Sequence, residues 1–205
     1  MSLLDVRNQN IEKVTKEALK MFVSKGIENS KVSDIAKNCD LAERSLFRYF
    51  PTKADLVLAA AKLFWHEMVK NSYNVLTQID NSLDGIDQLS IVVKTYAHQF
   101  FDNKEKLIFV QESEVYLYRY NKGILNPVDL LNNQDAPMYQ VIQKGVKDGS
   151  IKNQNIEELY LIVYDSLLGF MQKMATGIYA KSLSKAEQLQ YLNLFCEMLV
   201  NSFRK

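Results

Sequence analysis

The sequence predicts an all-α protein, and three observations carry this prediction. Apolar residues recur every three or four positions through most of the 205 residues, which is the period of an amphipathic helix. Only 7 Gly and 3 Pro occur, so the many tight turns of a sandwich or barrel are disfavoured. No stretch shows the strict apolar–polar alternation of a half-buried strand.

Composition limits the function only weakly. The net charge is +1, but residues 1–53 carry 10 Lys/Arg against 7 Asp/Glu, a net +3 that leaves −2 for the remainder. The two cysteines, Cys39 and Cys196, lie far apart, so we expect reduced thiols in a cytoplasmic protein and no zinc site. No apolar run is long enough to span a membrane, and no signal peptide opens the chain, so we expect no membrane partner.

The first helix is predicted from about Val6 to Lys25, where an apolar stripe ends at Gly26, a residue suited to closing a helix. Ser30 is the predicted N-cap of the next helix. In that helix Val32, Ile35 and Ala36 form an i, i+3, i+4 apolar set that faces a core.

A helix-turn-helix is predicted within residues 32–53. The turn falls at residues 38–41, where Asp40 suits a left-handed backbone conformation. The second helix is predicted from about Ala42 to Phe50, with Leu46 and Phe50 pointing inward, and Pro51 ends it. Its outward side chains suit the major groove of DNA and are Glu43, Arg44, Ser45, Phe47, Arg48 and Tyr49.

Three further side chains are candidates for phosphate contacts. Lys31 and Ser33 fall in the first turn of the first helix of the motif, where free backbone N–H groups attract an anion. Lys53 falls at the start of the following helix. The alternative is a three-helix piece of an ordinary helical protein whose charged face is only solvated.

Residues Leu19 to Leu56 resemble the DNA-binding domain of the TetR family of bacterial repressors. The matching pieces are Met21-Phe22, Gly26, Val32-x-x-Ile35-Ala36, Ser45-Leu46-Phe47, Tyr49-Phe50, Lys53 and Leu56. The resemblance implies that Glu43, Arg44 and Ser45 approach base edges. It also implies that Phe47, Tyr49 and Lys53 follow the phosphate backbone.

The sequence departs from the family pattern at several positions of this motif. Phe47 stands where the family usually has Tyr, so a phosphate-directed hydroxyl is missing. Lys31 replaces a usual Ser or Thr, and Asp40 a usual Gly. Arg44 stands where a small residue or Pro is common, and could read guanine or hold a phosphate.

A long helix is predicted from about Ala54 to Ile79, without a flexible linker before it. We therefore predict a DNA-binding domain at residues 1–53 and an effector-binding and dimerisation domain at residues 54–205. Further helices are predicted at residues 86–101, 104–120 and 128–148, the last of them split or kinked near Asp135 by Pro137.

The last two helices, predicted at about residues 155–178 and 184–203, are apolar on more than one side. In the final helix Leu189, Leu192, Cys196, Leu199 and Phe203 form a heptad-like seam. A helix that is apolar on two sides must be buried on both, so we predict a homodimer through a four-helix interface. The alternative is burial within a monomer.

The middle of the chain carries many aromatic side chains, most of which suit an ordinary core. Some are candidates for an apolar pocket that takes a small hydrophobic or aromatic effector, as the resemblance implies. The candidate ligand-binding residues are Trp65, Tyr96, His98, Phe109, Tyr116 and Phe170. We interpret His66 as a partly exposed helix residue and His98 as a core or pocket histidine; no catalytic motif, cofactor or metal site is predicted.

With the resemblance, the sequence indicates a ligand-responsive transcriptional regulator, a repressor that binds a palindromic operator as a homodimer. The rival interpretation is a dimeric helical carrier of hydrophobic molecules without sequence-specific DNA binding. An enzyme is a distant third, because no Gly-rich phosphate loop, Gly-x-Ser-x-Gly elbow or His-Glu-x-x-His motif occurs.

Overall fold

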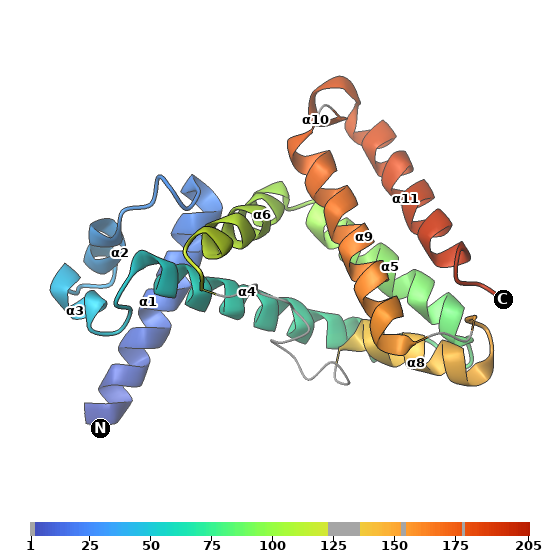
Figure 1. The fold of residues 1–205 in the computed structure, drawn as a ribbon, viewed down its shortest axis with the longest axis horizontal. Helices are drawn as coiled ribbons and strands as arrows, with labels where there is room; N and C mark the ends of the chain where they lie inside the picture. The colour runs from blue at the N-terminus through green and yellow to red at the C-terminus, as the bar shows by residue number, and fades with distance from the viewer. Residues whose placement is uncertain (1–2, 123–135, 153–154, 178) are drawn as a thin grey trace. The chain divides into compact units, whose positions relative to one another are not determined.

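The computed structural model describes residues 3–122, 136–152, 155–177 and 179–205. Within these ranges the regular elements are helices, and the one β-type pairing recorded is an isolated bridge between Ile151 and Arg204 (Figure 1). The predicted all-α class is confirmed. The helices are α1 (Leu3–Lys25), α2 (Val32–Asn38), α3 (Glu43–Phe47), α4 (Lys53–Leu76), α5 (Gly85–Phe101), α6 (Lys104–Arg119), α8 (Pro137–Asp148), α9 (Ile156–Thr176), α10 (Tyr179–Ser182) and α11 (Lys185–Asn201).

The chain divides into two compact units, and both α4 and α6 contribute to each of them. The first unit contains Met1–Glu67 together with Ile108–Leu130. The second contains Met68–Leu107 and Leu131–Lys205. The functional division between residues 53 and 54 stays a prediction, and it falls where α4 begins.

The core of the first unit joins three helices through aromatic rings. Phe22 of α1 stacks on Phe109 of α6 with ring centroids 6.3 Å apart, and Phe64 of α4 meets Phe109 edge-on at 5.9 Å. All three side chains are at most 3% exposed. Burial of this size supplies most of the free energy that holds α1, α4 and the second half of α6 together.

The predicted end of α1 is confirmed, but the predicted cap of α2 is wrong. Gly26 has a φ of +80°, the left-handed conformation that closes a helix, and its N–H donates to the Phe22 carbonyl. Ser30 is fully buried, and its hydroxyl donates to the Gly26 carbonyl at 2.8 Å. Because this hydroxyl serves the end of α1, Lys31 stands at the N-cap of α2 without a capping side chain.

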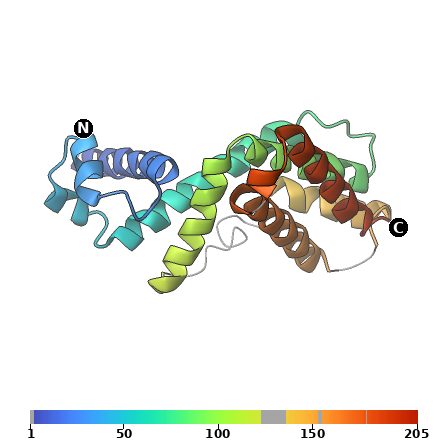
Figure 2. The same ribbon diagram turned by 90° about the horizontal axis from the view of Figure 1, so that it is seen from above.

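In the second unit, α5 packs against α8, α9 and α11, while α9 also contacts α8, α10 and α11 (Figures 1 and 2). The closest approach is between α5 and α8, at Gly85 and Gly145. A Cβ built on Gly85 would overlap the backbone of Gly145, so only glycine fits there. The chain end is fastened nearby, because Lys152 N–H donates to the Phe203 carbonyl at 3.0 Å.

Pro137 begins α8 rather than interrupting a helix. Proline is tolerated in the first turn because the N–H that it lacks would have no partner inside the helix. The earlier part of the predicted helix, with the kink expected near Asp135, lies outside the described residues. Gly149, with a φ of +80°, ends α8 as the sequence predicted.

The two final helices match their predicted ranges closely, but α10 between them was not predicted. A complete capping box starts α11: the Ser184 hydroxyl accepts from Glu187 N–H, and the Glu187 carboxylate accepts from Ser184 N–H at 2.8 Å. Such a cap stabilises a helix by about 1 kcal/mol.

The two apolar sides predicted for α9 differ in burial. On one side Tyr160, Val163 and Leu167 are at most 5% exposed. On the other, Leu168 and Met171 are buried within the unit, while Leu161 and Tyr164 are half-buried. Burial inside one chain thus accounts for part of the second side, and a dimer partner against it stays a prediction.

Candidate nucleic-acid interface

The first unit contains a helix-turn-helix built from α2 and α3. Ile35, Ala36 and Leu46 are at most 1% exposed, so both helices are held by one apolar seam. In the turn, Asp40 has a φ of +56°, as predicted, and Leu41 N–H donates to the Ala36 carbonyl at 3.0 Å. The buried residues on one side leave the other side of α3 at the surface.

The turn is tied to α1 by a single lysine. Lys13 Nζ donates to the Cys39 carbonyl at 2.9 Å and to the Asp40 carboxylate at 3.0 Å. Cys39 itself is 2% exposed, and burial raises the pKa of its thiol. It serves as a small buried group and is a poor nucleophile.

The helix α3 is shorter than predicted, since it covers Glu43–Phe47 and residues 48 and 49 form a turn. Pro51 pushes only the residue directly before it, Phe50, away from helical geometry, so it does not explain the end at Phe47. Phe50 nevertheless remains buried, as predicted, and its N–H donates to the Leu46 carbonyl at 3.0 Å.

The predicted groove-facing residues of α3 fall into an exposed and a half-buried group. Ser45 and Tyr49 are half-buried: the Ser45 hydroxyl accepts from Arg48 Nη2 at 3.3 Å, and the Tyr49 hydroxyl accepts from Asn10 Nδ2 at 3.2 Å. The exposed group is Glu43, Arg44, Phe47 and Arg48. This group combines two guanidinium groups, a carboxylate and a ring, the side-chain chemistry that base edges and phosphates accept.

The three predicted phosphate residues also differ in surroundings. Lys31 and Ser33 are exposed at the start of α2. Lys53, the first residue of α4, is half-buried, and its ammonium lies 6.0 Å from the centroid of the Tyr116 ring. Burial lowers the pKa of Lys53, and the nearby Glu28 carboxylate opposes that shift.

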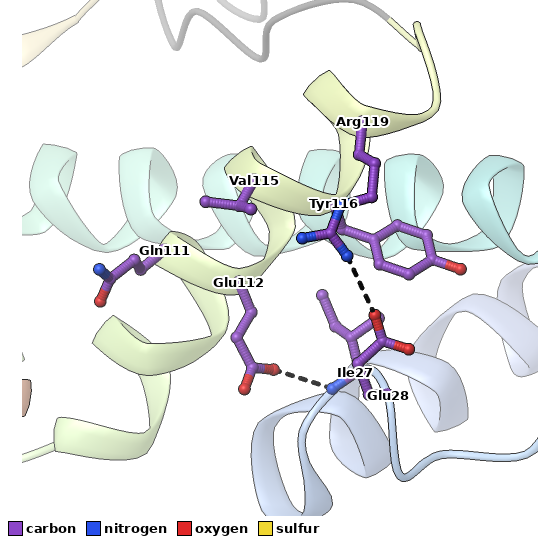
Figure 3. Close-up of a pocket in the computed structure, with 7 residues that line it drawn as sticks. All are labelled: Ile27, Glu28, Gln111, Glu112, Val115, Tyr116 and Arg119. Carbon is purple, nitrogen blue, oxygen red and sulfur yellow. Dashed lines mark hydrogen bonds and ion pairs between the residues drawn. The ribbon is translucent and has the colours of Figure 1, made fainter.

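The second half of α6 borders the turn between α1 and α2 around a cavity of about 330 Å³. The Glu112 carboxylate accepts the Ile27 N–H at 2.8 Å, and Arg119 pairs with Glu28 at 3.8 Å (Figure 3). Tyr116 stands between Glu112 and Arg119 in the chain, and its ring lies beside the Arg119–Glu28 contact (Figure 3). The periodicity of the sequence predicted α6 but not its packing against the turn between α1 and α2.

The six candidate ligand-binding residues do not gather in either unit alone. Trp65, Phe109 and Tyr116 belong to the first unit, and Tyr96, His98 and Phe170 to the second. These six residues therefore stay a prediction as an effector site.

Within the second unit the three candidates have separate surroundings. Tyr96 lines a narrow crevice with Val75 and Val92 that has no room for a water molecule, and Phe170 stacks on Phe195 with centroids 4.0 Å apart. His98 is exposed, so it is not a core histidine, and its place in a ligand pocket stays a prediction.

The position of His98 on α5 explains its exposure. Ile91 and Lys94 precede it on the same stripe, and neither is buried. From this stripe His98 Nε2 lies 2.8 Å from Asn193 Oδ1, and Lys94 pairs with Glu197 of α11 at 3.0 Å. These are polar contacts at the rim of the α5–α11 packing.

No helix among the described residues is long and apolar enough to cross a membrane. No group of three or more His, Cys, Asp or Glu side chains there is arranged to hold a metal ion.

Fold and site together define a helix-turn-helix protein with an attached helical unit. Residues 14–65 match the family model described as bacterial regulatory proteins, tetR family. The match covers the helix-turn-helix and parts of the helices on either side of it.

A curated relative gives a longer alignment at low identity. It is the uncharacterized HTH-type transcriptional regulator YerO of Bacillus subtilis, 23% identical over 167 residues that cover 76% of this chain and 56% of YerO. The chain therefore spans about half the length of this relative.

Solved structures share the fold over nearly the whole chain. A TetR-family transcriptional regulator from Pectobacterium atrosepticum has a TM-score of 0.74 at 15% identity, covering 100% of this chain and 98% of that one. The regulator FadR of Bacillus subtilis, solved with stearoyl-CoA, has a TM-score of 0.67 at 14% identity, covering 94% and 99%. At such identities the likeness shows the fold alone.

Proposed function

We propose that this chain is a homodimeric, ligand-responsive transcriptional regulator, a repressor that binds a palindromic operator through α3. The observation that carries the proposal is the division of α3 into two sides. Leu46 anchors the helix at 1% exposure, while Glu43 and Arg44 of the helix, and Arg48 directly after it, face solvent. A short helix that is packed against the protein on one side and carries charged side chains on the other can enter the major groove of DNA.

The homodimer is supported by apolar side chains that remain exposed on the last long helices. Ile162 of α9 is 50% exposed, and Tyr191, Leu194 and Met198 of α11 are 49%, 53% and 65% exposed. Two α3 helices related by a twofold axis match a palindrome, whose half-sites lie about 34–36 Å apart or at a multiple of that distance.

The effector is proposed to be a small hydrophobic or aromatic molecule. FadR was solved with stearoyl-CoA, an acyl ligand, and the second unit of this chain is rich in apolar and aromatic side chains. Binding would favour a dimer whose α3 helices are mis-spaced for the two half-sites, which lowers operator affinity. Such a regulator acts in the bacterial cytoplasm, where the chromosome lies.

The decisive experiment is a selection of bound sequences from random double-stranded DNA with the purified full chain. We expect the selected DNA to be enriched in a palindromic sequence. We also expect the protein to be a dimer in size-exclusion chromatography. The rival interpretation, a helical carrier of hydrophobic molecules, expects no enriched sequence. The effector step is then tested on the selected operator: a ligand that binds the protein yet leaves operator affinity unchanged contradicts regulation by that class of ligand.

A further inference from the structure

Four residues in and just after α6 contact the turn after α1 and the start of α4. Glu112, Tyr116 and Arg119 follow one another at spacings of four and three, so they share a helix face. Lys122 lies in the turn just after the helix end at Arg119 and is the fourth member of the set. The first and third members reach the turn after α1, as described above.

The remaining two members reach the first turn of α4. Lys122 pairs with the Asp55 carboxylate at 2.7 Å, and Thr52 donates to the same carboxylate from its N–H at 3.0 Å and its hydroxyl at 2.7 Å. These hydrogen bonds, that of Lys122 first, lower the pKa of Asp55. The start of α4, where Lys53 stands, is thereby fixed against α6.

Tyr116 offers Lys53 a neutral aromatic face. Tyr116 is 7% exposed, and its ring lies 4.6 Å from that of Tyr120. Burial, and a hydrogen bond with Tyr120, raise the pKa of Tyr116 to about 12, so the phenol is uncharged near neutral pH. The ammonium of Lys53 at 6.0 Å from this ring is within reach of a cation–π attraction.

We propose that Tyr116 is a positioning residue for DNA binding, which holds the Lys53 ammonium ready at the start of α4 for a backbone phosphate. This inference rests on the proposed function. A lysine has a long, flexible stem, and a phosphate contact must first order it. A ring on one side of the ammonium orders the stem in advance and leaves N–H groups on the opposite side for the phosphate oxygens.

The test is a double-mutant cycle on the selected operator, with affinity measured by fluorescence anisotropy across a salt series. Lys53→Met removes one phosphate contact, so the slope of log K against log salt should flatten by about 0.9. Tyr116→Leu should weaken binding and flatten the slope in the same direction. In the Lys53→Met background Tyr116→Leu should change nothing further, because the two side chains act as one unit.

Matched variants separate positioning from a general loss of structure. Tyr116→Phe keeps the ring and should bind as the unsubstituted protein does. Tyr118→Leu, at a side chain 73% exposed on the same helix, should also leave affinity and slope unchanged. Circular dichroism and thermal melting of each variant check that the fold is retained.

A second measurement needs no substitution at Tyr116. In the nuclear magnetic resonance spectrum of the unsubstituted protein, the Lys53 ε-methylene protons should be shifted upfield by the ring current. Absence of that shift overturns the inference, even where Tyr116→Leu fails to fold.

The binding results separate the two hypotheses. Tighter binding by Tyr116→Leu, or additive losses in the double variant, overturns the role of Tyr116 while operator binding stands. If Lys53→Met binds the operator as tightly as the unsubstituted protein does, the role of Tyr116 is likewise overturned. An unsubstituted chain without sequence preference instead overturns the proposed function.

Discussion

At the scale of single residues, Arg44 is the side chain on which sequence preference should depend most. It is exposed on α3, at the position where the family pattern has a small residue or proline. A guanidinium there can bond guanine through O6 and N7. Arg44→Ala should therefore relax the preference at one base pair of each half-site, at a cost of about 1–3 kcal/mol. Repeating the random-DNA selection with the variant measures this.

Lys31→Ala provides the comparison for Arg44→Ala. Lys31 is exposed at the start of α2, and as a phosphate contact it carries no sequence information. Its loss should weaken all duplexes alike and leave the selected sequence intact. A uniform loss from Arg44→Ala as well would mean that Arg44 holds a phosphate instead of reading a base.

Which side chains are buried could be predicted from the sequence at this scale, because burial follows helical period. Ile35, Ala36 and Leu46 are examples. Pairings between residues distant in the chain could not. Asn10 with Tyr49 and Tyr116 with Lys53 meet only after helices pack, and no local pattern encodes such contacts.

At the scale of elements, the contact between α5 and α8 depends on one glycine. A Cβ at Gly85 would overlap the backbone of Gly145, which cannot move aside as a flexible side chain can. Gly85→Ala should destabilise the protein by about 1–3 kcal/mol or more, as overpacking does. Urea unfolding followed by circular dichroism measures this, and an unchanged midpoint would contradict so close a helix approach.

Helix existence was predictable for most elements, whereas several boundaries were not. Ser30 has the composition of an N-cap, yet its hydroxyl donates to the carbonyl of Gly26 because it is buried under α1. The helix α3 ends at Phe47, earlier than the restriction that Pro51 places on Phe50 requires. The four-residue α10 is too short for a period to reveal it.

At the scale of the whole molecule, the grouping of helices into units departs from chain order. Residues 108–122 return to the first unit although the sequence predicts them within the second domain. Periodicity shows that α6 has apolar side chains but not which core receives them. Phe109 decides this, because it packs between Phe22 and Phe64.

If the chain is a homodimer, a substitution that separates the two subunits should lower both the mass of the particle and its affinity for the operator. Leu194 of α11 is 53% exposed beside Tyr191 and Met198, which a second copy of the chain would cover. Leu194→Lys would bury an unpaired ammonium in that interface. The free-energy cost of removing this charge from water would exceed what the dimer contacts supply. We expect light scattering after size exclusion to give the mass of a monomer, with helical content unchanged.

Val115→Lys is the matched control for Leu194→Lys, because Val115 is also 53% exposed but lies on α6. It should remain dimeric. Monomeric Leu194→Lys should lose most of its affinity for the full palindrome and bind a single half-site as the dimer does, because each α3 is intact and only the link between the two is gone. A Leu194→Lys protein that stays dimeric would place the interface on another face of the chain. A monomer with full palindrome affinity would mean that the two half-sites are bound independently.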